Sequence, residues 1–350
     1  MARVLLILVL ILFSGSIIAN DSELKAIEHL DTIKKFLHVA PERSRAVIIN
    51  NQESTNYLDN NKKIKWYTAG ATIGLKLNDL NLFEDSLKKI SYLINAKNLK
   101  HNQAHSLTLI GHYSLKRTLL DEARSSYNCL YSLSKAQDDK VKAAYRISNA
   151  FLNDGNIDNA EIIMKELLRI AVNRGKQNWL GPIKSTMGIY ALYRKEYLVA
   201  EKFFTESMLM HQEHQNYSGE FNSILNLLLT FLLSESDKFE RIEYRVARLS
   251  KKNKDSDRHK LFQLIQLVKT SKLEGDNKKH QGLAMQYFEQ IKSSTVKKAA
   301  TDFIFPQLKM TVIESKVTYK ANWIREFLVK LECEVQPVNL HKILNDLSGF

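Results

Sequence analysis

Apolar residues along most of this chain recur every three or four positions, which is the spacing of one face of an α-helix. Residues 22–38 are a clear example, because Leu24, Ile27, Leu30 and Ile33 fall near a single helical face. No segment has the sustained apolar–polar alternation of a half-buried strand. Residues that break helices are few, with 12 Gly and 4 Pro in 350 residues. The pattern predicts an all-α protein whose helices are joined by short polar turns.

One arrangement of small and large residues occurs four times, at intervals of 37, 37 and 40 residues. In each copy one small residue stands 12 positions before another: Gly74 and Ser86, Gly111 and Ala123, Ser148 and Ala160, Gly188 and Ala200. A large apolar residue follows four positions after the second small one: Ile90, Tyr127, Met164 and Phe204. Small residues let two antiparallel helices approach closely, and a period of this length is typical of stacked helical repeats.

The repeats predict four hairpins, each with a first helix A and a second helix B. Their expected ranges are 63–77 with 82–95, 104–116 with 120–135, 141–153 with 157–174, and 182–194 with 198–212. Two weaker hairpins follow, at 221–233 with 239–251 and at 259–273 with 281–292. Before the repeats we expect an introductory pair, residues 22–38 and a second helix from Pro41 to about Asp59. Three closing helices are expected at 303–317, 321–333 and 339–347.

These elements resemble the tetratricopeptide repeat family. The best match is repeat three, with AYRISNAF at 144–151 and DGNIDNA at 154–160, followed by repeat four, with MGIY at 187–190 and YLVAEKFF at 197–204. The early Trp of the family pattern is missing, and the period exceeds the usual 34 residues. The resemblance implies a TPR-like α-solenoid, a superhelical stack of antiparallel helix hairpins. The expected domains are 1–19, a signal peptide; 20–62, the introductory pair; 63–300, the repeats; and 301–350, C-terminal capping helices.

The resemblance also implies a binding groove lined by the A helices. The residues at groove-facing positions are His105, Thr108 and His112 in repeat two, Lys142, Tyr145, Asn149 and Asn153 in repeat three, and Ser185, Ile189, Leu192 and Tyr193 in repeat four. Their hydroxyls and amides suit the donors and acceptors of an extended peptide backbone, and they lack the paired Lys and Arg of a carboxylate clamp. The predicted partner is a peptide or protein. A solvated inner face without a ligand is the alternative, as is a structural subunit whose groove packs against its own copy.

The first 19 residues have the order of parts of a secretory signal peptide. Arg3 supplies a positive start, Val4 to Phe13 is an apolar run, and Ala19 offers a small residue for cleavage. The run is shorter than the roughly 20 residues that cross a bilayer comfortably. We expect a periplasmic or secreted protein with no transmembrane span in the mature chain, with an uncleaved N-terminal anchor as the alternative. The likeness then extends to the periplasmic sensor halves of some bacterial signalling proteins.

The two cysteines, Cys129 and Cys333, are expected to be separate buried thiols. Export would permit a disulfide. However, each hairpin of a repeat array touches mainly its neighbours, so a bridge between residues this far apart would require the chain to fold back.

Positive charge gathers in the second half of the chain. The net charge is +13, and residues 241–300 hold 15 Lys+Arg against 6 Asp+Glu. One predicted helix carries a basic face of Arg241, Arg245, Arg248 and Lys252. Residues 241–298 therefore predict attraction to an acidic envelope component such as anionic lipid or polysaccharide. The alternative is that the basic face is a solvated convex surface. Nucleic acid is not expected as a partner, because only Tyr244 is interleaved with these charges.

No catalytic motif accompanies the repeats. The chain has no nucleophile elbow, phosphate-binding loop or zinc-ligand spacing. His101 and His105 are one turn apart without an evident third ligand, and His112 lies about 10 Å further along the helix axis. We therefore expect a binding protein, with no enzymatic activity, no cofactor and no metal site.

Overall fold

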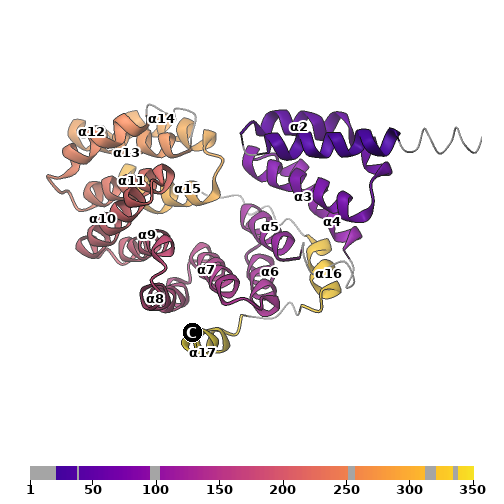
Figure 1. Ribbon diagram of the computed structural model, residues 1–350. Coiled ribbons are helices and arrows are strands. Elements are labelled where there is room, and N and C mark those ends of the chain that lie inside the picture. The colour runs from indigo at the N-terminus through magenta and orange to yellow at the C-terminus, as the bar shows by residue number, and fades with distance from the viewer. Residues whose placement is uncertain (1–20, 38, 95–102, 251–256, 312–320, 334–337) are drawn as a thin grey trace, which may run out of the picture. The chain divides into compact units, whose positions relative to one another are not determined.

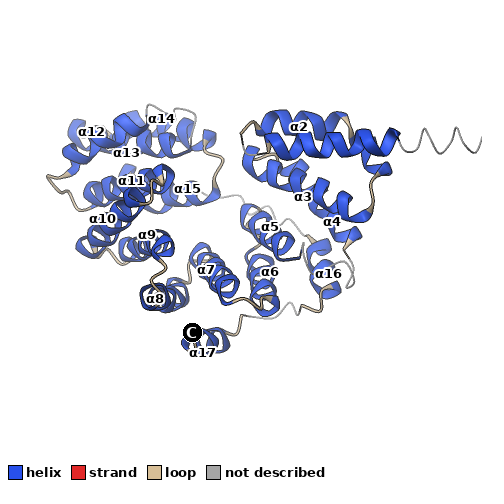
Figure 2. Cartoon of the chain, in the orientation of Figure 1, coloured by secondary structure: helices blue, strands red, loops and turns tan. Residues whose placement is uncertain are grey.

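The computed structural model describes residues 21–37, 39–94, 103–250, 257–311, 321–333 and 338–350. Every regular element within these ranges is a helix, so the predicted all-α class is confirmed (Figures 1 and 2). The predicted signal peptide and the apolar run lie outside the described residues, as do His101 and Lys252.

The helices follow one another as hairpins. Residues 21–36 are helical, followed by α2 (Pro41–Asn50) and the short 3-10 helix η1 (Gln52–Tyr57). Six hairpins come next: α3 (Asn60–Leu77) with α4 (Leu80–Leu93), α5 (Gln103–Lys116) with α6 (Leu120–Leu133), α7 (Gln137–Asn153) with α8 (Ile157–Asn173), α9 (Gln177–Tyr193) with α10 (Tyr197–Glu213), α11 (Tyr217–Leu233) with α12 (Phe239–Ser250), and α13 (Asp257–Glu274) with α14 (Asn277–Gln290). The last elements are α15 (Ser294–Ala299), the π-helical turn η3 (Ala300–Ile304), η4 (Phe305–Leu308), α16 (Asn322–Lys330) and α17 (Leu340–Ser348).

The small residues of the repeat pattern let the two helices of each hairpin approach closely. A Cβ atom at Gly188 of α9 would lie 2.6 Å from the Phe204 ring of α10, so only glycine fits there. In α7 the hydroxyl of Ser148 donates to the carbonyl of Ala160 on α8, at 2.7 Å. The glycine thus faces the large residue of the pattern at Gly188, whereas the serine faces the small one.

The chain divides into two units. Unit 1 comprises residues 1–133 and 320–336, and unit 2 comprises residues 134–319 and 337–350. The introductory pair and α3 in unit 1 share a core that includes Ile33, Ile48, Trp66 and Ile73.

In unit 2 the hairpins from α7 to α14 stack in sequence order, because α8 packs on α9, α10 on α11, and α11 on both α12 and α13. Phe204, Leu228 and Ile265 belong to one continuous core that runs from α9 to the end of η4. Consecutive stacking of antiparallel hairpins, as predicted, is therefore present within this unit.

A disulfide joins Cys129 of α6 to Cys333, just after α16, with 5.4 Å between their Cα atoms. The expectation of two separate thiols was wrong. The chain does fold back, because α16 has its own apolar face, with Ile324, Phe327 and Leu328 buried in unit 1. An ion pair from Arg325 to Glu122 of α6, at 2.9 Å, supports the same contact.

The segment expected to cap the array, residues 301–350, has three destinations. Residues up to Leu308 pack against α13 and α14 at the last hairpin, as a cap would. Helix α16 packs on α6 within unit 1, and α17 packs on α8 within unit 2. Neither α16 nor α17 therefore extends the end of the stack, since each covers the B helix of an earlier repeat.

Candidate ligand-binding surface

The predicted groove residues of repeats three and four lie on α7 and α9 of unit 2. Lys142 is exposed, and the partly exposed positions are Tyr145, Asn149, Asn153, Ser185, Ile189 and Tyr193. We call these seven residues the α7/α9 face. Leu192 was wrongly assigned to this set, because it is only 3% exposed and belongs to the core of unit 2.

A hydrogen bond ties the two A helices together at the α7/α9 face. The Tyr145 hydroxyl lies 3.1 Å from Oγ1 of Thr186 on α9. Thr186 donates its hydroxyl proton to the carbonyl of Pro182, at 3.1 Å. Because a hydroxyl has one proton to give, Tyr145 is the donor in its bond to Thr186. Sequence reasoning missed Thr186, which is buried one position after the predicted Ser185.

Polar groups on the same face remain available to a ligand. Asn153 donates its side-chain amide to the carbonyl of Asn149, at 2.8 Å. Within the described ranges, neither the amide of Asn149 nor the hydroxyl of Ser185 has a hydrogen-bond partner. Lys142 is held by Asp139 one turn earlier, at 3.1 Å, and so adds little net charge. The surface therefore offers neutral donors and acceptors more than charge.

Tyr193, at the end of α9, already contacts Asp302 and Phe303 of η3. Its hydroxyl donates to the carboxylate of Asp302, at 2.5 Å, and its ring centre lies 4.8 Å from that of Phe303. Burial, together with the Asp302 carboxylate, raises the pKa of Tyr193, which keeps the phenol protonated and able to donate. Lys298 pairs with the same carboxylate at 2.9 Å.

The predicted residues of repeat two lie on α5 in unit 1. His105 is exposed, and Thr108 donates its hydroxyl to the carbonyl of Ala104 in its own helix, at 2.9 Å. Nδ1 of His112 lies 3.1 Å from the hydroxyl of Tyr127, so this ring helps to hold α5 against α6. The predicted groove residues of repeats three and four thus lie together in unit 2. Those of repeat two belong to unit 1.

The basic face lies on α12 in unit 2. Arg245 is neutralised by Glu220 of α11, at 2.7 Å, whereas Arg241 and Arg248 are exposed. Tyr244 lies between them in the sequence and is 77% exposed. Lys269 of the neighbouring α13 pairs with Glu243, at 2.9 Å. Of the three described residues of the predicted basic face, Arg245 alone is therefore compensated by a nearby carboxylate.

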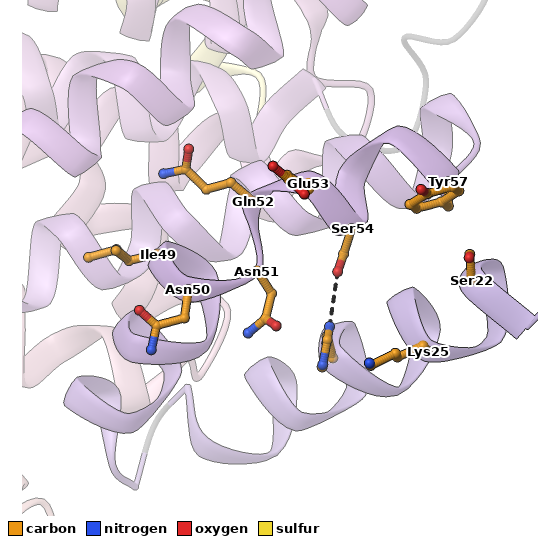
Figure 3. Close-up of a pocket in the computed structure, with 10 residues that line it drawn as sticks. Ser22, Lys25, Ile49, Asn50, Asn51, Gln52, Glu53, Ser54 and Tyr57 are labelled. Atoms are coloured by element: carbon orange, nitrogen blue, oxygen red, sulfur yellow. Dashed lines mark hydrogen bonds between the residues drawn. The ribbon is translucent and has the colours of Figure 1, made fainter.

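A polar pocket that sequence reasoning missed lies in unit 1 between the helix at 21–36 and the end of α2 (Figure 3). Its volume is about 500 Å³, and it is lined by Ser22, Lys25, His29, Ile49, Asn50, Asn51, Gln52, Glu53, Ser54 and Tyr57. The pocket exists because the predicted helix from Pro41 to Asp59 ends early. Asn51 turns its amide back to the carbonyl of Val47, at 2.9 Å, and the chain continues as η1. His29 and Ser54 are joined across it at 3.0 Å.

No group of three or more His, Cys, Asp or Glu among the described residues is arranged to hold a metal ion. None of the helices within the described ranges is both long and apolar enough to cross a membrane.

Comparison with known proteins leaves this chain without a family assignment. No protein-family model matches it, and no curated protein matches it in sequence. Among solved structures, it is similar to a Rap protein complexed with Competence and Sporulation Factor, with 13% identity and a TM-score of 0.47, over 93% of this chain and 99% of that one. The function of the protein must therefore be inferred from its own residues.

Proposed function

We propose that this protein is a non-enzymatic scaffold or sensor that binds a peptide or protein segment on the α7/α9 face. The observation that carries the proposal is the hydrogen bond from Tyr145 to Thr186, which fixes the two A helices beside the unpartnered groups of Asn149 and Ser185. An extended peptide presents backbone N–H and carbonyl groups that such amides and hydroxyls can satisfy. The nonpolar part of the contact would come from Ile189, which is partly exposed.

The test is capture of the partner from an envelope extract with a tagged chain, residues 20–350. We expect Asn149→Ala with Ser185→Ala to lose the partner without a change in melting temperature, because neither side chain has a partner within the described structure. Asn173→Ala is the matched control, since it removes an exposed amide at the end of α8. Undiminished capture by the double variant would overturn the assignment of this face.

We also propose that the protein acts outside the cytoplasm, after removal of residues 1–19. The Cys129–Cys333 bond supports this proposal, because disulfides persist mainly in oxidising compartments. Mass spectrometry of the protein recovered from a periplasmic or secreted fraction tests it. A mature chain that begins at Asn20 and carries no free thiol is expected. Recovery of reduced protein from the cytoplasm would contradict the proposal.

A second candidate function is binding of an anionic envelope surface through α12. It is favoured by Arg241 and Arg248, which are exposed and have no acidic partner within the described residues. The exposed ring of Tyr244 between them suits a membrane–water interface, where one end of the side chain is apolar and the other polar.

A further inference from the structure

Residues 294–308 form a segment with a firmly anchored side and a less buried side. Ile304, Phe305 and Leu308 are fully buried in the core of unit 2, where the segment packs against α13 and α14. Asp302 and Lys298 are more accessible, with side-chain exposures of 24% and 31%. Phe303, next to Asp302, is only partly buried against this core, so displacement of Asp302 and Phe303 would leave the fully buried anchors in place.

The accessible side of this segment meets the end of the α7/α9 face. Asp302 and Phe303 together cover Tyr193, the carboxylate accepting its hydroxyl proton and the ring packing against its ring. Ile189, one turn earlier on α9, packs against the same core. The backbone here is a π-helical turn, a rare geometry that is frequent at functional sites.

We infer that Tyr193 and Ile189 form a subsite for an acidic–aromatic pair of ligand residues, which the chain's own Asp302 and Phe303 fill when no ligand is bound. The inference rests on the proposed peptide-binding function and adds the class of peptide: a carboxylate followed by an aromatic side chain. A ligand of this class would replace the hydrogen bond from Tyr193 to Asp302 and the ring contact with Phe303 by equivalent contacts of its own.

The chemistry of Tyr193 explains why this class of ligand is favoured. The partly buried hydroxyl of Tyr193 needs an acceptor, and a carboxylate is the strongest acceptor that a peptide offers. Aromatic rings with centres 4.5–7 Å apart stabilise one another beyond the area that they bury. Lys298 lies on the same segment, residues 294–308, beside the Asp302 carboxylate. Its positive charge attracts Asp302 and would attract the acidic residue of an incoming ligand in the same way.

The experiment is a binding titration of the full-length mature chain with a fluorescent synthetic peptide of residues 298–307, KAATDFIFPQ. In the native protein the internal segment competes at a high effective concentration, so binding should be weak. Asp302→Ala with Phe303→Ala vacates the subsite, and we expect the peptide to bind this variant about tenfold more tightly. Adding Tyr193→Phe should remove most of that gain. A peptide with Asn in place of Asp is the matched control.

Equal binding by the native and vacated chains, or binding by neither, would overturn the inference. If Phe303→Ala unfolds the protein, Asp302→Ala alone tests the carboxylate part, because its side chain is partly exposed. Loss of partner capture in the Asn149→Ala and Ser185→Ala variant, together with no peptide binding, would leave the proposed function standing and reject only this subsite. If the Asp302→Ala and Phe303→Ala variant binds the peptide but the native chain captures no partner, the subsite would stand and the proposed function would be rejected.

Discussion

At the residue scale, packing between A and B helices depends on positions where any side chain larger than hydrogen would not fit. Gly188 is the clearest case, because the edge of the Phe204 ring lies only 2.6–2.8 Å from the place where its Cβ atom would be. Gly282 of α14 is the opposite case, since nothing beyond the adjoining residues and backbone of its own helix lies within 4 Å of the place where its Cβ would be. The two glycines have the same covalent structure, and only their surroundings decide what a methyl group would do.

Gly188→Ala should lower the free energy of unfolding by about 1–3 kcal/mol, because the added methyl group must displace a core ring. Gly282→Ala should raise it by about 0.5–1 kcal/mol, because alanine loses less backbone freedom in a helix. Chemical denaturation of both variants measures the difference. Equal effects of the two substitutions would show that the contact with Phe204 is not tight.

A second residue-scale prediction concerns His211, which is buried in α10. Burial and the nearby His214 lower the pKa of His211 below its ordinary value of 6.5. The folded protein therefore resists protonation at a pH where the unfolded chain accepts a proton. The contribution of neutral His211 to the free energy of unfolding is fully present above pH 6.5. It is lost as the pH falls through the folded-state pKa of His211. Melting temperatures between pH 7.5 and 5 should fall less steeply in His211→Gln; parallel curves would contradict this.

At the element scale, α16 is held on α6 by an apolar face, an ion pair and a covalent bond. The contributions are unequal. An ion pair with an exposed partner such as Arg325 contributes less than about 1 kcal/mol. A disulfide contributes more, since it restricts the unfolded chain.

Replacing both Cys129 and Cys333 with serine should cost roughly 2–5 kcal/mol of stability. It should also speed proteolytic cleavage within residues 321–333, because α16 then depends on its apolar face and the ion pair alone. Arg325→Ala is the control, and its cost should stay below about 1 kcal/mol. Denaturation and limited proteolysis test both. A larger cost for Arg325→Ala than for the cysteine pair would reverse this ranking of the ion pair and the disulfide.

The exposed arginines of α12 carry the other element-scale prediction. Arg241→Ala with Arg248→Ala should weaken binding to vesicles containing phosphatidylglycerol roughly tenfold or more at low salt, since each basic residue near an anionic surface contributes about 1 kcal/mol. Lys165→Ala with Lys202→Ala removes the same charge elsewhere on unit 2 and serves as the control. Equal losses would mean that net charge alone causes the binding, and salt-insensitive binding would reject the electrostatic surface.

At the scale of the whole molecule, neither unit is one continuous stretch of the chain, because each is built from two separate segments. After residue 319 the chain enters unit 1, where it contributes α16, and from residue 337 it belongs to unit 2 again, where it contributes α17. Each helix covers the B helix of a repeat that was made nearly two hundred residues earlier. The last fifty residues therefore complete both units.

Two truncations separate these contributions. Ending the chain at residue 311 should raise hydrogen exchange in α6 and in α8, because α16 and α17 are both lost. Ending it at residue 336 should raise exchange in α8 only, since α16 and its disulfide remain. Unchanged protection of α6 in the shorter chain would show that α16 does not stabilise unit 1.

The local part of this structure could be predicted from the sequence, and the long-range part could not. Hairpins such as α7–α8 follow from helical periodicity and from the small residues Ser148 and Ala160, which act over a dozen positions. The bond between Cys129 and Cys333, and the contact of Tyr193 with Asp302, join residues that no periodicity relates. The error at Leu192 has a local cause, because positions one residue apart at the end of a helix can face core or solvent.

The disulfide also determines how the molecule would carry mechanical load. Cys129 and Cys333 are 204 residues apart, so the bond closes a covalent loop around most of the repeats. Tension applied between the two ends of the chain would pass through the bond and bypass everything inside the loop. The end-to-end length of the fully stretched chain would therefore be roughly 700 Å shorter with the disulfide intact than with it reduced, at about 3.3–3.6 Å per extended residue. The hairpins from α7 to α14 lie inside the loop and would stay folded under a pull that unfolds the two ends of the chain.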